Sequence, residues 1–273
     1  MAIADVMPGA RKVHVRREER EGGEVAFVTL DDEARLNAMG AELMQRFLTA
    51  LARLAEDKAL RCVVLTGAGG RAFCAGANLA DLASISGPRD AVGFIRQVHA
   101  CCEAVRALPV PVIARINGAA LGAGLELAIS CDLSVASASA RFGMPEVRLG
   151  VPSVVEAALL PGLIGWGRAR EMLLLGETRD AEAAHAMGLV ETVVPPDGLD
   201  AAVDTKIAAL LAARPEAVKL QKALMRRWEN LPTREAIEAG VEAFAEAYLT
   251  DEPARAMEAF RAEQERRKGR PEG

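Results

Sequence analysis

The stretch Leu121–Asp132, Leu-Gly-Ala-Gly-Leu-Glu-Leu-Ala-Ile-Ser-Cys-Asp, joins a loop of small residues to an apolar helical run. Gly122, Ala123 and Gly124 leave backbone N–H groups open to a ligand at the point where we expect a helix to begin. Helix N-termini favour negative charge, so this loop suits a developing oxyanion. Glu126 follows among apolar neighbours, where it could transfer a proton. The alternative is a surface helix whose Glu126 faces water.

The composition is that of a globular protein large enough to bury a full core. The chain has 273 residues, of which 51% are hydrophobic and 26% charged, with a net charge of −5. This acidic chain, with 7 Phe, 2 Trp and 1 Tyr, lacks the basic field and the stacking surfaces that nucleic acids require. No apolar run approaches the roughly 20 residues of a membrane span. The sequence therefore predicts neither a nucleic-acid partner nor a membrane-spanning helix.

The cysteines and histidines predict a reduced protein without a metal site. The cysteines are an odd set with one adjacent pair: Cys62, Cys74, Cys101, Cys102 and Cys131. Charges also interrupt Met1–Glu21, where a signal peptide would need its apolar region, so we expect a cytoplasmic protein. The histidines are isolated and no C-x-x-C occurs, which argues against zinc. The absence of a G-x-S-x-G motif argues against a serine hydrolase.

Strand-like and helix-like segments alternate along the first half of the chain. We expect strands at Val25–Leu30, Arg61–Thr66, Val112–Ile116 and Leu133–Ala136, helices at Ala41–Glu56 and Asp90–Ala107, and loops at Asp31–Asn37 and Gly67–Leu79. From about Val151 the pattern is mainly helical apart from a short strand in Gly188–Val194, and after Pro215 it is helical throughout. The alternation predicts an α/β layered core followed by a helical arm.

A competing motif, Gly67–Ala72, fits the G-x-G-x-x-A pattern of dinucleotide-binding loops after a strand. Three features argue against NAD binding. The strand does not begin a βαβ unit, the following residues form a second Gly/Ala loop instead of an apolar helix, and Asp90 is the only acid near the expected distance.

Four segments in order resemble the enoyl-CoA hydratase/isomerase (crotonase) superfamily. They are Arg35–Ala38, Ala72–Leu79, Asn117–Ala128, and Phe142–Glu146 with Leu149-Gly150. The order and spacing agree from about Val25 to Val194. The resemblance implies an α/β fold with a crotonase-like spiral of ββα turns over residues 1–200. It also implies a helical region over 201–273 that assembles a homo-trimer or a dimer of trimers.

The same resemblance implies a fatty-acyl coenzyme A thioester as the substrate, with coenzyme A part of that substrate and no separate cofactor. Two backbone N–H groups hold the thioester oxygen in the family, and the matching positions are Ala77 and Ala123. By position, Glu126 matches the residue that activates water, and Glu146 the residue that exchanges a proton with the α-carbon. The residues placed around the coenzyme A and the thioester are Ala34, Arg35, Leu36, Ala75, Asn78, Leu79 and Gly122.

The paired glutamates favour hydration of a 2-trans-enoyl-CoA to the 3-hydroxyacyl-CoA, because hydration needs two proton transfers on one face. A double-bond isomerase needs only one such base, and another acyl-CoA lyase or hydrolase also remains an alternative on such a fold. A third alternative is a non-catalytic acyl-CoA binder or oligomeric assembly protein, against which the intact Glu126 and Glu146 argue. For Glu146 itself, the alternative is an ordinary carboxylate at a helix start after Pro145.

The chain departs from the family's pattern near the acyl pocket and near the coenzyme A phosphates. Pro152–Glu156 replaces a Pro-Gly-Ala-Gly-Gly-like run, and we interpret Glu156 as a solvated helix residue instead of a third catalytic acid. Ala34 stands where the family often has a lysine for the phosphates. Arg35 could supply that charge, as could Arg266–Lys268 from a neighbouring subunit.

Overall fold

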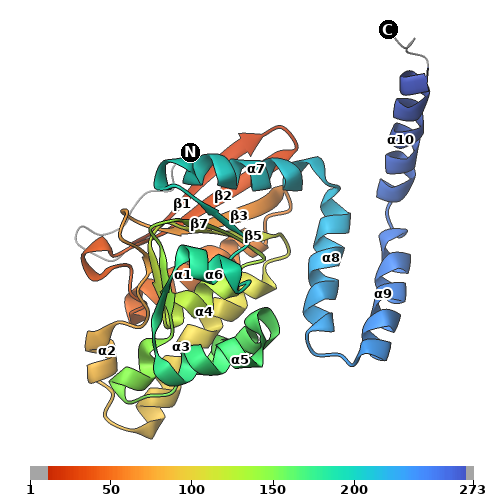
Figure 1. The fold of residues 1–273 in the computed structure, drawn as a ribbon. Coiled ribbons are helices and arrows are strands. Elements are labelled where there is room, and N and C mark those ends of the chain that lie inside the picture. Colours follow the sequence, from red (N-terminus) through yellow and green to blue (C-terminus); the bar gives the residue numbers. More distant parts are fainter. Residues whose placement is uncertain (1–11, 269–273) are drawn as a thin grey trace. The chain divides into compact units, whose positions relative to one another are not determined.

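The computed structural model describes residues 12–268, which form two compact units, one ending at Leu210 and one beginning at Leu211. The first unit combines two β-sheets with helices, and the second is helical (Figure 1). Residues 1–11 of the charged N-terminal segment lie outside the described residues. Over residues 12–268, no helix is both long and apolar enough to cross a membrane.

Two sheets form the framework of the first unit. The larger sheet has the order β1 (Lys12–Arg20), β2 (Gly23–Asp31), β3 (Leu60–Gly67), β5 (Val112–Ile116), β7 (Leu133–Ser137), β10 (Thr192–Val194). Its strands are parallel except for the antiparallel pair β1–β2. The smaller sheet has the order β4 (Ala72–Cys74), β6 (Ala119–Leu121), β8 (Arg141–Gly143), β9 (Thr178–Asp180). In it β4, β6 and β8 run parallel to one another.

The chain visits the two sheets in turn, which confirms the expected spiral of ββα turns. Strand β3 of the large sheet leads into β4 of the small one and then into α2 (Leu79–Ala83) and α3 (Pro88–Ala107). The next turn is β5, β6 and α4 (Ala123–Ile129). A third runs through β7 and β8 to α5 (Leu160–Leu175) by way of the short helices η2 (Pro145–Leu149) and η3 (Val155–Leu159).

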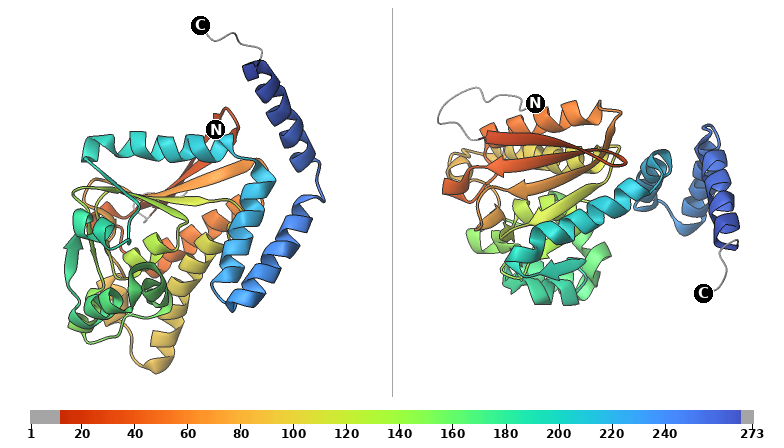
Figure 2. Two further views of the ribbon diagram at one scale, coloured as in Figure 1. Left: turned by 45° about the vertical axis from the view of Figure 1, so that its right-hand side comes forward. Right: turned by 90° about the horizontal axis from the view of Figure 1, so that it is seen from above.

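Helices cover both faces of the large sheet. The left view of Figure 2 shows α7 (Leu199–Ala212) along one face and α1 (Ala41–Ala55) and α3 on the other. Two ion pairs join α7 to the sheet, Asp200 to Arg115 at 2.7 Å and Asp204 to Arg20 at 2.8 Å. Strand β3 therefore lies between two helical layers, and its residues from Cys62 to Leu65 are at most 1% exposed. This burial on both faces is typical of a strand whose residues are almost all apolar.

Several elements differ from the sequence-based expectation. The segment Gly67–Leu79 is not a single loop, because it contains β4 and ends where α2 begins. Strands β1, β6, β8 and β9 were not predicted, and the strand expected within Gly188–Val194 is confined to β10. Strands β6, β8 and β9 have three residues each, too few for a period-2 pattern to show, whereas β1 has nine residues but is mostly charged, Lys-Val-His-Val-Arg-Arg-Glu-Glu-Arg. Longer elements such as α1, α3 and β5 match their predicted ranges closely.

The second unit contains α8 (Pro215–Trp228), α9 (Thr233–Ala247) and α10 (Glu252–Lys268). The indole N–H of Trp228 donates to the carbonyl of Ala236 at 2.8 Å, which fixes the turn between α8 and α9. The Glu252 carboxylate accepts hydrogen bonds from the backbone N–H groups of Glu216 and Ala217 and so caps α8. Apolar side chains on α9 and α10 are exposed, among them Phe244 (69%) and Phe260 (55%).

Candidate active site

The site is built where three parallel strands end. Strands β4, β6 and β8 are neighbours in the small sheet, so the residues that follow them lie at the same edge. These residues are Ala75–Asn78 after β4, Gly122–Ala123 after β6 and Met144–Glu146 after β8. Segments about 25 to 70 positions apart in sequence are thereby brought together, since carboxyl ends of parallel strands collect ligand-binding loops.

The first of these segments is fixed by backbone hydrogen bonds to the residues after η1 (Glu33–Arg35). Met39 donates to the carbonyl of Gly76 at 2.8 Å, and its own carbonyl accepts from the N–H of Asn78 at 3.0 Å. This is a parallel β-bridge between Met39 and Ala77. In such a bridge the N–H of the central residue points away from the partner. The N–H of Ala77 therefore faces away from Met39.

The Arg35–Ala38 motif supports this segment, chiefly through Asn37. The Asn37 side chain is fully buried, accepts from the N–H of Asp32 at 3.1 Å and donates to the carbonyls of Ala68 and Ala72. Both Leu36 and Asn37 have left-handed backbone conformations, with φ near 56° and 57°. Asn tolerates that region because its side chain replaces lost backbone hydrogen bonds. The motif thus has a structural role in holding the loop before α1.

The second segment depends on the absence of side chains at Gly122 and Gly124. Gly122 has φ 52° and ψ −125°, and a Cβ there would overlap Oε1 of Glu146. A Cβ on Gly124 would overlap the carbonyl oxygen of Cys74. A Cβ on Gly76 would lie 3.8 Å from the N–H nitrogen of Ala123, so the two loops are in contact. Ala123 is the first residue of α4, where backbone N–H groups have no intrahelical partner.

Gly124→Ala is expected to destabilise the protein by about 3 kcal/mol or more, because the added methyl group meets backbone that cannot move aside. Gly93→Ala is the matched control, since Gly93 is also helical and has open space at its Cβ position. This control should leave stability unchanged or raise it by up to about 1 kcal/mol through helix propensity. Urea unfolding of both variants measures the difference; equal stabilities would show that α4 does not pack against β4 this closely.

Glu126 is buried in the wall of the site, so the alternative of a water-facing residue is wrong. Glu126 is only 3% exposed, and its Oε1 accepts a hydrogen bond from the N–H of Ala157 at 3.1 Å. Burial raises the pKa of Glu126 to about 8, the Ala157 hydrogen bond opposes this rise, and the charges of Glu146 and Glu156 add to it. Glu126 therefore holds a proton at neutral pH.

Glu146 lies in the first turn of η2, directly after Pro145. The hydroxyl of Ser153 donates to its Oε2 at 2.7 Å, and its Oε1 occupies the space that a Cβ on Gly122 would fill. Glu146 is thus a residue at a helix start, as the alternative had it, and its carboxylate also faces the loop that begins α4. The small residue at position 122 is what gives this carboxylate room.

Glu156 differs from its expected role as a solvated residue. It is only 6% exposed, and its Oε1 lies 2.7 Å from Nδ1 of His99 on α3. The reason is tertiary: η3 packs against both α3 and α4, which covers this short helix on two sides. Sequence reasoning noted the unusual Pro152–Glu156 segment but gave no role to His99, and no motif in the sequence marks it.

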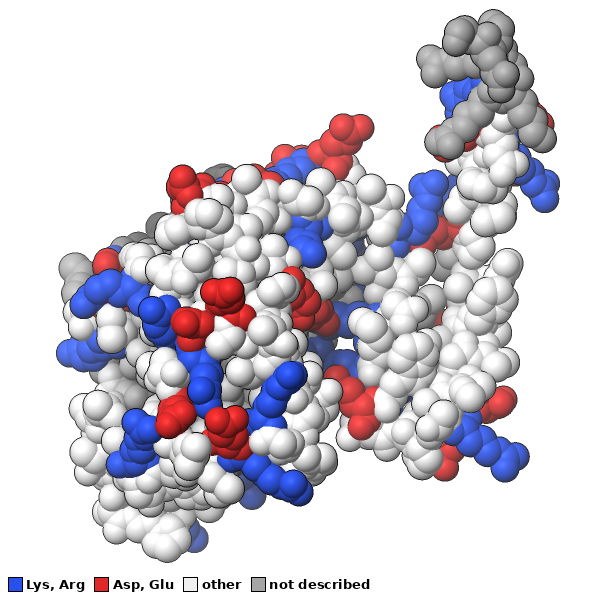
Figure 3. Space-filling model, viewed as in Figure 1, with Lys and Arg blue, Asp and Glu red and all other residues white. Residues whose placement is uncertain are grey.

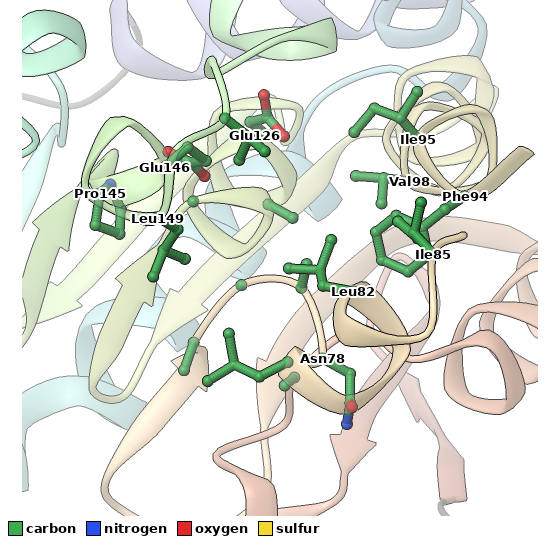
Figure 4. Close-up of a pocket in the computed structure, with 18 of the residues that line it drawn as sticks. Asn78, Leu82, Ile85, Phe94, Ile95, Val98, Glu126, Pro145, Glu146 and Leu149 are labelled. Atoms are coloured by element: carbon green, nitrogen blue, oxygen red, sulfur yellow. The ribbon is translucent and has the colours of Figure 1, made fainter. Parts of the chain in front are cut away.

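A cavity of about 700 Å³ joins these segments, a size that suits a small-molecule ligand. Figure 4 shows Glu126 and Glu146 on one side of it and an apolar group, including Leu82, Phe94 and Val98, on the other. All the residues predicted for the site line this cavity: Ala34, Arg35, Leu36, Ala75, Ala77, Asn78, Leu79, Gly122, Ala123, Glu126 and Glu146.

The lining residues differ in what their side chains do. Asn78 caps α2, because its Oδ1 accepts from the N–H groups of Ala80 and Asp81. Leu79 is 67% exposed, and Arg35 is exposed too, with one guanidinium nitrogen 3.3 Å from Asp32. Leu79 and Arg35 thus form an open rim, whereas Asn78 and Glu126 are buried. Arg266 lies in the second unit, and the side chains of Arg267 and Lys268 lie outside the described residues.

The Gly67–Ala72 motif is not a dinucleotide loop. It leads into strand β4, not into a helix whose N-terminus could receive a pyrophosphate. The Asn117 side chain donates to the carbonyls of Gly67 at 3.0 Å and Gly69 at 2.6 Å, which ties the loop to the end of β5. The loop thus serves the packing of the small sheet.

On the face drawn in Figure 3, the described basic and acidic side chains of the first unit are interspersed. Neither sign forms a continuous patch on that face.

Comparison with known proteins identifies the family. Residues 20–270 match the profile of the enoyl-CoA hydratase/isomerase family. The chain is 33% identical over 243 residues to the short-chain-enoyl-CoA hydratase of Clostridium acetobutylicum, covering 89% of this chain and 92% of that protein. It is 31% identical over 237 residues to the crotonyl-CoA hydratase of Syntrophomonas wolfei, covering 86% of this chain and 91% of that protein.

The fold agrees with this relationship. The crystal structure of an enoyl-CoA hydratase from Bacillus anthracis superimposes with a TM-score of 0.87 at 30% identity, covering 92% of this chain and 96% of that one. The small-sheet strand ends, the glycine-rich start of α4 and the lined cavity all lie within the matched residues. The chain belongs to the enoyl-CoA hydratase/isomerase family, whose members have the crotonase fold and act on acyl-coenzyme A substrates.

Proposed function

We propose that this protein hydrates a 2-trans-enoyl-CoA to the 3-hydroxyacyl-CoA. The observation that carries the proposal is the pairing of Glu126 and Glu146 in one cavity wall, close enough for the charge of Glu146 to raise the pKa of Glu126. Hydration adds a hydroxyl to one carbon and a proton to its neighbour, so it requires two groups that transfer protons on one face. Coenzyme A enters as part of the substrate, and the reaction needs no other cofactor.

The thioester oxygen is proposed to bind the backbone N–H groups of Ala77 and Ala123. The N–H of Ala77 faces away from its β-bridge to Met39, and that of Ala123 is the first in α4. Addition to the conjugated thioester places negative charge on this oxygen. A hydrogen-bond donor of this kind stabilises the transition state by roughly 3–4 kcal/mol. Because the donors are main-chain groups, alanine serves as well as glycine at both positions.

The two glutamates can carry the protons that this reaction and its reverse require. In dehydration, protonated Glu126 gives its proton to the leaving hydroxyl while Glu146 accepts the α-proton. Hydration passes through the same steps in the opposite direction, with the proton first on Glu146 and Glu126 accepting one from water. The raised pKa of Glu126, about 8, lets that residue hold or release a proton near neutral pH.

The remaining lining residues divide between the acyl chain and coenzyme A. We assign the acyl chain to the apolar side of the cavity, formed by Leu82, Ile85, Phe94, Ile95 and Val98. Coenzyme A is assigned to the side of the cavity whose exposed edge is formed by Ala34, Arg35 and Leu79, with the less exposed Leu36, Ala75, Asn78 and Gly122 beside them. Arg35 is the cation at this rim that could meet a phosphate group.

The absorbance of the conjugated thioester of crotonyl-CoA tests the proposal. Wild-type protein is expected to remove the conjugated band and to give a 3-hydroxyacyl product. A 3-enoyl-CoA assayed in parallel distinguishes the alternatives, since an isomerase would create the conjugated band without adding water. Tight binding of thioesters without turnover of either substrate would instead indicate an acyl-CoA binder and would contradict the proposed reaction.

We further propose that the protein assembles as a homo-trimer or a dimer of trimers through its helical C-terminal region. Large hydrophobic side chains on α9 and α10 are exposed, including Ile237 (65%), Phe244 (69%) and Phe260 (55%), as is Tyr248 (63%) directly after α9. Exposed apolar faces of this kind are typical of surfaces that pack against another chain.

A further inference from the structure

The turn that begins η3 has an unusual backbone conformation. Val155 has a φ of 41°, in the left-handed region. A β-branched residue rarely adopts this region, because its Cβ substituents crowd the following carbonyl. Such a conformation persists only where surrounding contacts hold it, and residues of this kind cluster at functional sites.

The two residues after Val155 make contacts that explain how the turn is held and what it supplies. Glu156 points back to α3, where its Oε1 lies 2.7 Å from Nδ1 of His99. Ala157 points to α4, where its N–H donates to Oε1 of Glu126 at 3.1 Å. On one side of the turn, His99 thus holds the buried Glu156. On the other side, the N–H of Ala157 donates a hydrogen bond to Glu126.

We propose that His99 and Glu156 are positioning residues for Glu126, because their hydrogen bond holds the strained turn at Val155 and so keeps the Ala157 N–H against the Glu126 carboxyl. The inference rests on the catalytic role proposed above for Glu126. Neither His99 nor Glu156 lines the cavity, so they act through the turn and not on the substrate.

The geometry leaves Glu156 dependent on His99. Its Oε2 is buried and has no hydrogen-bond partner among the described residues, so His99 is the side chain that fastens this carboxylate. His99 itself is half exposed, which allows its removal without opening a cavity in the core. A buried carboxylate that loses its partner moves toward water, and here that movement would carry Ala157 with it.

The titratable groups around Glu126 lie on four elements, of which three carry a group that interacts with it. Glu146 on η2, Glu156 on η3 and Cys102 on α3 interact with Glu126 directly, whereas His99 on α3 contacts Glu156 and Cys74 on β4 lies beside Gly124 of α4. Burial raises the pKa of the Cys74 thiol to about 11 and that of Cys102 well above its ordinary value, so both thiols stay protonated at the pH of an assay. Changes in the titration of Glu126 therefore report on the carboxylates and on the Ala157 hydrogen bond.

His99→Leu is the first variant, and His14→Leu is its matched control. His14 also pairs with a carboxylate, Asp31 at 2.6 Å, and its side chain is 51% exposed against 52% for His99. We expect His99→Leu to lower kcat roughly 10- to 100-fold with little change in KM, because Glu126 loses its alignment and the substrate keeps its contacts. His14→Leu should match the wild type, and equal kcat values for the two variants would overturn the proposal.

The pKa of Glu126 distinguishes loss of the Ala157 hydrogen bond from a general loosening of the structure around Glu126. Carbon-13 NMR of protein with labelled glutamate carboxyls follows this group, and Glu126→Gln identifies its signal. The Ala157 hydrogen bond lowers the pKa of Glu126. His99→Leu should therefore raise that pKa further, whereas loosening that admits water would lower it and contradict the proposal. This titration needs no turnover, so it tests the turn even if the proposed hydration fails.

Two further variants test the turn and the charge separately. Glycine adopts the backbone of Val155 without strain, so Val155→Gly should restore a large part of the kcat lost in His99→Leu. Glu156→Gln keeps an oxygen that can accept from His99 but removes a negative charge near Glu126. It should keep kcat near wild type and lower the pKa of Glu126. No recovery in His99→Leu/Val155→Gly would show that the pair does not hold this turn.

Discussion

Glu146→Gln is expected to lower kcat for the hydration of crotonyl-CoA about 10³-fold, which is the range that general acid–base groups contribute. Glutamine keeps the shape of the side chain and an oxygen for the Ser153 hydroxyl, but it cannot exchange a proton with the α-carbon. Binding of a saturated thioester such as butyryl-CoA should survive, because the cavity and the loops of Ala77 and Ala123 are unchanged.

Steady-state kinetics and calorimetric titration with butyryl-CoA measure these two effects. Glu42→Gln, at an exposed glutamate of α1, is the control and should keep the wild-type rate. A Glu146→Gln variant with full activity would rule out the paired-glutamate mechanism. Glu126→Gln should also stop hydration but leave exchange of the α-proton with deuterated solvent, because Glu146 remains; an isomerase that uses Glu146 alone would keep its activity in this variant.

Glu126→Gln is expected to make the protein more stable than the wild type at alkaline pH. The unfolded carboxyl ionises near its ordinary pKa of 4.5, whereas burial keeps the folded one protonated to about pH 8. Between these values the folded state binds more protons than the unfolded state, so the stability of the wild type falls as pH rises and the loss is complete above pH 8. A pKa shift of this size corresponds to a loss on the order of 5 kcal/mol.

Glutamine keeps an oxygen for the Ala157 N–H and has no charge to bury, so the variant avoids this loss. Urea unfolding at fixed protein concentration, at pH 5, 7 and 9, measures the difference. The gain should be small at pH 5 and largest at pH 9, and Glu42→Gln should show no such trend. A constant difference at all three pH values would mean that Glu126 is not the buried acid described here.

The sequence was sufficient for the long elements and for the composition of the site. Helix α1 followed from apolar residues such as Leu43, Phe47 and Leu51 at helical spacing, and β3 from an unbroken apolar run. Gly122 and Glu126 were recognised from the sequence because small residues precede an apolar helical run and that run contains a single carboxylate. The four family segments then ordered these residues along the chain.

The tertiary structure decided which residues meet and which are buried. Strands β4, β6 and β8 have three residues each, too few for a periodic signal, yet their pairing brings Ala77, Ala123 and Glu146 to one edge. The burial of Glu156 and its bond to His99 arise from the packing of η3 against α3, elements that no local pattern connects. Local sequence determines helices and strands through spacing and side-chain type, whereas burial and proton affinity depend on neighbours that only the folded chain supplies.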